Sequence, residues 1–422
     1  MRTTPRPTLI LSSYLSQGHA RVGRVLLVVL AGAGLQLMMQ ALIARTLTKT
    51  EVGVVSLLLG ALPILSTLSL FGQDSATVRF LSRSPSGTYD ARSHVNRVMA
   101  VVVPLAVLAG VAGAWFYGLG AGLGATLVVL ILSQNAVTIV TSVMRAAHRY
   151  ELAMAGVRMP AMAAAVVMLF LRLTDALTLR SSVVALGLAF GLSALCIFVA
   201  GRRGLDVGDG TVPRSVMGEG VLFFGLGISF AFMIAIDKLI IGKMMTYADL
   251  AIYASIFAVM RGFDFLFYSI SYVLMPRVNR IHRLKLKRIN LSIAGLAAVV
   301  TAGYLLLGDD VVRLLYEGKY DVGSYLILPF ALSGIAKLFY SVPSSVIGAR
   351  LPRTALKQFM WFNLAGMVLN VALDIALILR MGLAGAALAT AASWGLRLGG
   401  GYVILWLNRA HLDAAEAPVE TA

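Results

Sequence analysis

Twelve long apolar runs, separated by short polar breaks, fill most of this 422-residue sequence. A helix needs about 20 residues to cross the roughly 30 Å hydrocarbon core of a bilayer. Only 13% of the residues are charged, about half the share found in ordinary soluble domains. The pattern therefore predicts an all-α polytopic membrane protein, with 12 transmembrane helices at 22–44, 52–72, 98–117, 120–143, 159–179, 183–200, 219–242, 250–275, 291–307, 322–345, 359–379 and 383–407.

Basic residues exceed acidic ones, and the net charge is +17. With the N-terminus placed inside, Lys and Arg on the inner segments outnumber those on the outer loops by three to one. The positive-inside rule then predicts that both termini are cytoplasmic. The basic run 276–288 lies on an inner loop beside anionic head groups, so nucleic acid is not an expected partner. Run 22–44 is too long for the apolar part of a signal peptide and is predicted to be the first span.

The sequence pattern repeats in its two halves. Segment 42–83 can be laid without gaps on 239–280, because each holds a helix end, a short outer loop, a long span and a basic inner loop. Six helices in each half predict two pseudo-symmetric lobes of the same orientation, related by an axis along the membrane normal, with a cavity between them. The expected parts are a cytoplasmic segment at 1–21, lobes at 22–200 and 219–407, a cytoplasmic linker at 201–218 and a cytoplasmic tail at 408–422.

Five segments resemble a known family of membrane transporters. The outer loop at 44–57, the span end at 70–83 and the Asp–basic pair with a later Tyr–Ala step in 236–261 are similar to polysaccharide exporters and O-antigen flippases. The connections at 314–334 and 381–394 follow in the same order. These proteins form the polysaccharide branch of the multidrug/oligosaccharidyl-lipid/polysaccharide (MOP) flippase superfamily.

The resemblance implies a V-shaped pair of six-helix bundles that alternates access between the two sides of a bacterial inner membrane. The implied cargo is an undecaprenyl-diphosphate-linked oligosaccharide, with membrane lipids and polysaccharide-assembly membrane proteins as further partners and no cofactor. Lipid II flippases of the superfamily usually carry two more C-terminal helices, which this sequence does not show. The polysaccharide branch is therefore favoured.

Apart from residues near span ends (Arg24, Arg172, Asp175 and Glu219), seven ionisable residues fall inside the predicted spans, all in the second half. Each costs about 2.5–3.5 kcal/mol at a helix centre on insertion scales, so we expect them to face a cavity or a partner. The predicted diphosphate-binding residues are Arg261, Lys337, Arg397 and Lys238, joined at the cytoplasmic mouth by Arg24 and Arg79. The predicted supporting or coupling residues are Asp264, Asp237, Asp374, Gln36, Gln40, Gln134 and Asn135.

Arg261 and Asp264 lie three positions apart near the middle of one span. They point to nearly the same side of a helix, so they could neutralise each other. The alternative is that Arg261 faces the cavity, where its planar guanidinium would bind a diphosphate through paired hydrogen bonds. Asp264 would then hold Arg261 in the empty state. The sequence leaves both interpretations open.

Two other functions remain open at this level. A cation-coupled multidrug antiporter of the same superfamily would use a membrane-embedded carboxylate, and Asp237, Asp264 and Asp374 supply candidates. A membrane glycan polymerase would need catalytic groups on the outer side, where the largest loop is 308–321. An enzyme is not expected, because the sequence shows neither a nucleophile motif nor a metal-ligand cluster, and Cys196 is the single cysteine.

Overall fold

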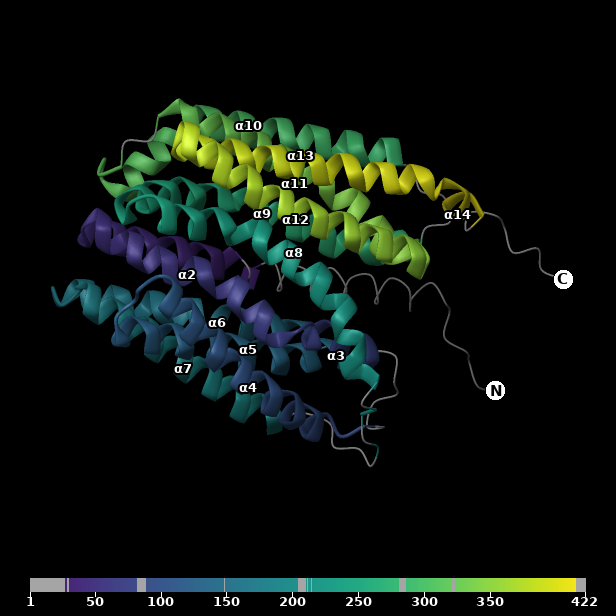
Figure 1. Ribbon diagram of the computed structural model, residues 1–422, viewed down its shortest axis with the longest axis horizontal. Coiled ribbons are helices and arrows are strands. Elements are labelled where there is room, and N and C mark those ends of the chain that lie inside the picture. The colour runs from purple at the N-terminus through teal and green to yellow at the C-terminus, as the bar shows by residue number, and fades with distance from the viewer. Residues whose placement is uncertain are drawn as a thin grey trace, which may run out of the picture. The chain divides into compact units, whose positions relative to one another are not determined.

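The computed structural model describes residues 27–28, 30–81, 89–147, 149–203, 210, 212–213, 215–280, 286–320 and 323–414. Within these ranges the chain is almost entirely helical, and long helices follow one another through short turns (Figure 1). Ten helices of the described part are long and apolar enough to cross a membrane. The chain is therefore a multi-pass membrane protein of the predicted all-α class.

The ten candidate spans coincide with the second to eleventh predicted spans. The first predicted span contains a helix over residues 30–46, and its residues 22–26 and 29 lie outside the described ranges. The last predicted span coincides with helix α13 (Leu383–Leu407). Helix α13, which contains several glycines and Arg397, is not among the ten.

The inner loops hold more helix than the sequence indicates. Helix α2 (Lys49–Leu70) ends where Phe71 and Gly72 take positive φ values of 48° and 71°, and α3 (Gln73–Leu81) starts directly after them. Helices α9 (Tyr247–Arg280) and α10 (Leu286–Tyr316) both extend into the basic loop predicted at 276–288. Lys and Arg are good helix formers, and basic side chains at the C-terminal end of α9 interact favourably with the negative pole of the helix dipole.

The chain divides into two compact units. Unit 1 comprises the chain up to Leu42 and Leu68–Val221, and unit 2 comprises Ile43–Thr67 and Leu222–Ala422. The break at Val221 lies close to the predicted linker, whereas most of α2 groups with unit 2. The predicted lobe boundaries remain a prediction.

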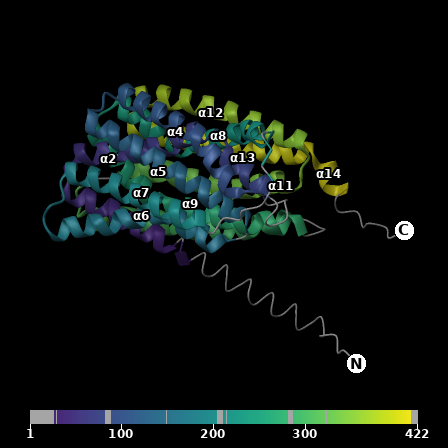
Figure 2. The same ribbon diagram turned by 90° about the horizontal axis from the view of Figure 1, so that it is seen from below.

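Unit 1 is built around α5, which packs against α3, α4, α6 and α7. Its core is a set of small and β-branched residues on α4, α5 and α7, including Val98, Val137 and Ile197. Figure 2 shows α4 to α7 as a set of helices with short connections. The helices are α4 (Ala91–Phe116), α5 (Ala121–Ala146), α6 (Tyr150–Leu173) and α7 (Leu179–Arg203).

Unit 2 is centred on α11, which packs against α9, α10, α12 and α13. Helices α10 to α13 run side by side in Figure 1, in green to yellow. Buried aromatic rings from α9, α11 and α13 contact one another in its interior, among them Phe267, Tyr340 and Trp394. The remaining helices are α8 (Ser215–Met244), α11 (Ser324–Arg350), α12 (Arg353–Met381) and α14 (Arg409–Ala414).

Helices α2 and α9 follow corresponding outer loops of the two predicted halves, and both start with the same kind of capping box. Thr48 and Glu51 exchange hydrogen bonds at the start of α2, with the Thr48 amide 2.9 Å from Glu51 Oε2. Thr246 and Asp249 do the same at the start of α9, at 3.1 Å. Such a box satisfies two backbone donors at a helix N-terminus. The boxes lie 198 residues apart, one more than in the gapless superposition of the two segments.

A reciprocal clasp joins two connections of unit 2. Arg45 donates to the carbonyl oxygens of Leu314 and Leu315 in the last turn of α10, at 2.7 Å each, and pairs with Glu317 at 3.1 Å. Lys319 donates in turn to the carbonyl oxygens of Ala44 and Leu47, at the end of the helix over 30–46. Each connection thus satisfies the final carbonyls of the other helix.

Candidate functional site

Two adjacent residues of α8 organise the buried polar groups of unit 2. Asp237 and Lys238 are both buried, at 1% and 7% exposure, within a helix whose other residues here are apolar. Neighbouring positions on a helix point about 100° apart. The two side chains accordingly contact different partners, and they define two clusters.

The basic cluster consists of Lys238, Arg261, Asp264 and Lys337, from α8, α9 and α11. Lys337 pairs with Asp264, Nζ to Oδ1 at 2.7 Å, and the two side chains are 1% and 17% exposed. The ammonium of Lys238 lies 3.5 Å from the centroid of the Phe257 ring and 3.4 Å from the carbonyl oxygen of Ile234. Lys337 also lies beside this ring, at 5.6 Å.

The basic cluster carries an excess of positive charge. Lys238 interacts electrostatically with Arg261 and Lys337 and with the carboxylates of Asp237 and Asp264, so three basic groups lie among two acidic ones. An aromatic face stabilises an ammonium but does not neutralise it, and burial of an unneutralised charge is costly. The cluster therefore suits a multivalent anion that enters it.

The carboxylate cluster consists of Asp237, Tyr253, Asn370, Asp374 and Thr390, from α8, α9, α12 and α13. Asp237 Oδ2 accepts from the Tyr253 hydroxyl at 2.5 Å and from the Thr390 hydroxyl at 2.7 Å. Asp374 Oδ2 accepts from the amide of Asn370 at 2.9 Å, and Asp374 interacts electrostatically with Asp237. All five residues are buried.

Three oxygens of the carboxylate cluster lack a hydrogen-bond donor among the described residues: Oδ1 of Asp237, Asn370 and Asp374. Buried oxygens of this kind are satisfied by a hydrogen-bond donor, an ordered water or a cation, and carboxylate, amide and hydroxyl oxygens are the ligands of hard cations. Within the described ranges, no group of three or more His, Cys, Asp or Glu side chains is arranged so that it could hold a metal ion. Two carboxylates with neutral oxygens fit a monovalent cation or a proton.

Arg397 is 1% exposed and donates to backbone carbonyls of two other helices, Ser229 at 2.8 Å and Asn363 at 3.4 Å. Its guanidinium carbon lies 5.9 Å from the Trp394 ring, and Lys337 lies 5.2 Å from the same ring. These contacts tie α8, α12 and α13 together. Its predicted role in diphosphate binding stays a prediction.

The predicted site residues of unit 1 are described by themselves. Asn135 is fully buried and donates to Ser69 Oγ at 2.7 Å, which ties α5 to the end of α2. Gln134 is part-buried and contacts Thr138 at 3.4 Å. Gln36, Gln40 and Arg79 are part-buried on their helices, and Arg24 lies outside the described residues.

Sequence reasoning missed Tyr253, Asn370 and Thr390, and with them the aromatic support from Phe257 and Trp394. Asn370 and Asp374 stand four positions apart in an apolar span, and that spacing places both on one helix face. That spacing could have pointed to Asn370 as a neighbour of the predicted Asp374. Tyr253 and Thr390 belong to other helices, and only the packing of these helices brings their hydroxyls to Asp237.

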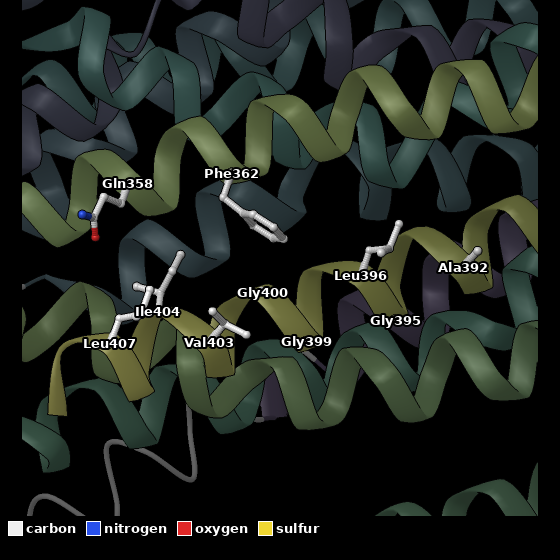
Figure 3. A pocket seen from close by; sticks show the side chains of 10 residues that line it. All are labelled: Gln358, Phe362, Ala392, Gly395, Leu396, Gly399, Gly400, Val403, Ile404 and Leu407. Carbon is white, nitrogen blue, oxygen red and sulfur yellow. The ribbon is translucent and has the colours of Figure 1, made fainter.

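A separate groove of about 780 Å³ runs between α12 and α13 (Figure 3). Phe362 points towards Gly400, where a Cβ would lie 1.9 Å from the ring. The lining is apolar apart from one amide; it consists of Gln358, Phe362, Ala392, Gly395, Leu396, Gly399, Gly400, Val403, Ile404 and Leu407. The groove shares no residue with either cluster.

Neither a protein-family model nor a curated protein sequence matches this chain. Solved structures do share its fold. The lipid II flippase MurJ in an inward closed conformation aligns with a TM-score of 0.63 at 11% identity, over 93% of this chain and 89% of MurJ. An inward-facing multidrug resistance MATE family transporter of the MOP superfamily gives 0.61 at 14%, over 92% and 96%. The MATE multidrug transporter DinF-BH in complex with R6G gives 0.62 at 14%, over 94% and 96%.

These similarities show that the chain shares the fold of the MurJ and MATE transporter structures. The three structures are those of one flippase and two multidrug transporters. The predicted fold class is confirmed.

Proposed function

We propose that the chain is a flippase that moves an undecaprenyl-diphosphate-linked oligosaccharide from the inner to the outer leaflet of a bacterial inner membrane by alternating access. The observation that carries this proposal is the excess positive charge of the basic cluster. Lys238 and Lys337 are both buried beside one ring, and Asp264 is the acidic partner of Lys337. A diphosphate would supply the missing negative charge.

The diphosphate would bind through two kinds of donor. Lys238 and Lys337 act as point charges, while the fork of Arg261 donates two hydrogen bonds to phosphate oxygens. The polyprenyl tail stays in the lipid. The cytoplasmic orientation of both termini and the contacts with polysaccharide-assembly proteins belong to this proposal.

The carboxylate cluster would couple transport to a cation gradient. Tyr253 links the clusters, since its hydroxyl binds Asp237 and its ring stacks with Phe257 at 6.4 Å and 21°. The ammonium of Lys238 in turn lies over the ring of Phe257. A cation bound at Asp237 would therefore affect Lys238 in two ways, as its neighbour on α8 and through the rings of Tyr253 and Phe257. Binding at one cluster would then depend on binding at the other.

A cation-coupled multidrug antiporter is the second candidate, favoured by the carboxylate cluster and by the likeness to MATE transporters. The basic cluster separates the two functions, because its charge attracts an anionic head group and repels a cationic drug. Identification of the transported substrate decides between the flippase and the antiporter.

The test is a flipping assay in liposomes with a fluorescent undecaprenyl-diphosphate glycan. Arg261→Ala should lower the protein-dependent rate about tenfold or more, since a charge-assisted bidentate contact is lost. Lys357→Ala is the matched control, an exposed basic residue of α12 outside both clusters. A normal rate in Arg261→Ala would refute the diphosphate role, and efflux of cationic dyes without flipping would establish the antiporter.

A further inference from the structure

We propose that the groove between α12 and α13 binds an anionic phospholipid, with one acyl chain in the groove and the phosphate at the end where Gln358 lies. The groove shares no residue with the basic or the carboxylate cluster, so this inference goes beyond the proposed function and does not depend on it. Its rim is apolar and open, since Leu396, Val403 and Leu407 are 46%, 54% and 64% exposed. On membrane-spanning helices such a rim meets lipid.

The groove is too narrow for a helix and wide enough for a hydrocarbon chain. From Ala392 to Leu407 helix α13 rises about 22 Å. Spread over this length, the volume of about 780 Å³ corresponds to a mean cross-section of about 35 Å². A helix about 10 Å across would need about 80 Å². The dimensions therefore favour a lipid chain over a helix of a second copy of the protein.

Two glycines line the groove without serving the packing of the helices. A Cβ at Gly395 or Gly399 would meet no atom of the described chain within 4 Å, whereas a Cβ at Gly400 would collide with the ring of Phe362. Glycine weakens a helix interior relative to alanine. Gly395 and Gly399 instead keep the groove open, and a flexible chain can approach the backbone there.

One end of the groove has the features of a membrane–water interface. Gln358, the one amide of the lining, lies at this end together with Leu407 (Figure 3). Trp361 and Trp406 stand close to them in the sequence and are 66% and 71% exposed. Tryptophan gathers at the level of the lipid head groups, where the amide of Gln358 can donate to an ester or phosphate oxygen.

The same end is complementary to a phosphate. Helix α12 has 29 residues and begins at Arg353, after the N-cap Pro352, which makes no side-chain cap hydrogen bond. The first N–H groups and the positive pole of the helix dipole favour an anion there. Arg353 is exposed and lies about 7.5 Å along the helix from Gln358. No acidic residue occurs at 351–362 or 402–412, so an anionic head group meets no opposing charge from these segments.

The experiment measures the Kd of the first bound lipid on the full chain in detergent by native mass spectrometry, with phosphatidylglycerol and with phosphatidylcholine. Gly399→Leu should weaken both lipids about tenfold or more, because the leucine side chain fills the groove. Arg353→Gln should lower the preference for phosphatidylglycerol about fivefold, as expected for one basic group at the head group.

Two matched controls should change neither value by more than about twofold. Gly295→Leu alters an equally open glycine on α10, and Arg380→Gln removes an exposed charge at the other end of α12. Gly395→Leu replaces Gly399→Leu if the latter shifts the unfolding transition.

Unchanged binding in Gly399→Leu, or an equal loss in Gly295→Leu, would overturn the groove as a lipid site. An unchanged preference in Arg353→Gln would overturn the position of the phosphate. Displacement of phosphatidylglycerol by a lower concentration of undecaprenyl diphosphate would assign the groove to a polyprenyl chain. A dimer that Gly399→Leu dissociates would assign it to a second copy. All of these results overturn the phospholipid site and leave the proposed function standing.

Discussion

Removal of Asp264 should reveal how strongly the basic cluster depends on its acidic member. Asp264→Ala leaves the Lys337 ammonium 1% exposed, with Lys238 beside the same Phe257 ring. Loss of one partner of a buried ion pair costs about 3–5 kcal/mol. Because Asp264 is 17% exposed and two aromatic faces remain next to Lys337, the expected loss of unfolding free energy is at the lower end, about 3 kcal/mol.

The double variant gives the matching test of charge. Lys337→Met conserves volume and removes one of the like charges around Lys238, so it should cost about 1 kcal/mol. Asp264→Ala with Lys337→Met removes both members of the ion pair together. The combined loss should fall short of the sum of the single losses by about 2 kcal/mol.

The assay is denaturant unfolding in detergent, followed by tryptophan fluorescence, to which Trp394 contributes as a buried residue close to Lys337. Pyrophosphate should restore Asp264→Ala by about 2.7 kcal/mol at a hundred times its Kd. Asp309→Ala is the control, because its pair with Arg313 lies on the surface and is worth at most about 1 kcal/mol. Additive losses, or no response of Asp264→Ala to pyrophosphate, would refute the reasoning.

Two further predictions concern charge and pH. Burial raises the pKa of Tyr320 to about 12, against about 10 in an unfolded chain; the stability linked to its neutral form is complete below pH 10 and is lost as the pH rises to 12. Tyr320→Phe should therefore flatten the alkaline part of the stability profile, and a melt at pH 9 and pH 11.5 checks it. Asp374→Asn removes one carboxylate of the proposed coupling site, so glycan-lipid flipping should lose its dependence on an imposed sodium or proton gradient; a retained dependence would place coupling elsewhere.

The positions of the spans could be predicted from the sequence because length and apolarity alone determine whether a segment can cross a bilayer. Helix α3 was missed, since nine residues with Asp74 and Arg79 carry no such signal. It forms because positive φ values at Phe71 and Gly72 end α2 and allow a new start. The hydropathy of a sequence gives no information on backbone conformation of that kind.

The site was predictable only in part for a similar reason. The cost of charge in a membrane identified Lys238, Arg261, Asp264 and Lys337 individually, and the structure brings them together. The recorded partner of Asp264 is Lys337, which is 73 residues away, while the sequence offered the neighbour Arg261. Local spacing shows what shares a helix face, and partners on other helices depend on packing that no single span encodes.

The reciprocal clasp of Arg45 and Lys319 makes two connections dependent on each other's length. One residue added between Leu315 and Lys319 would move the lysine away from the carbonyls that it caps. The positive φ values at Glu317 and Gly318, 53° and 68°, leave little slack to absorb such a change. A change in the length of one of these connections therefore calls for a matching change in the other.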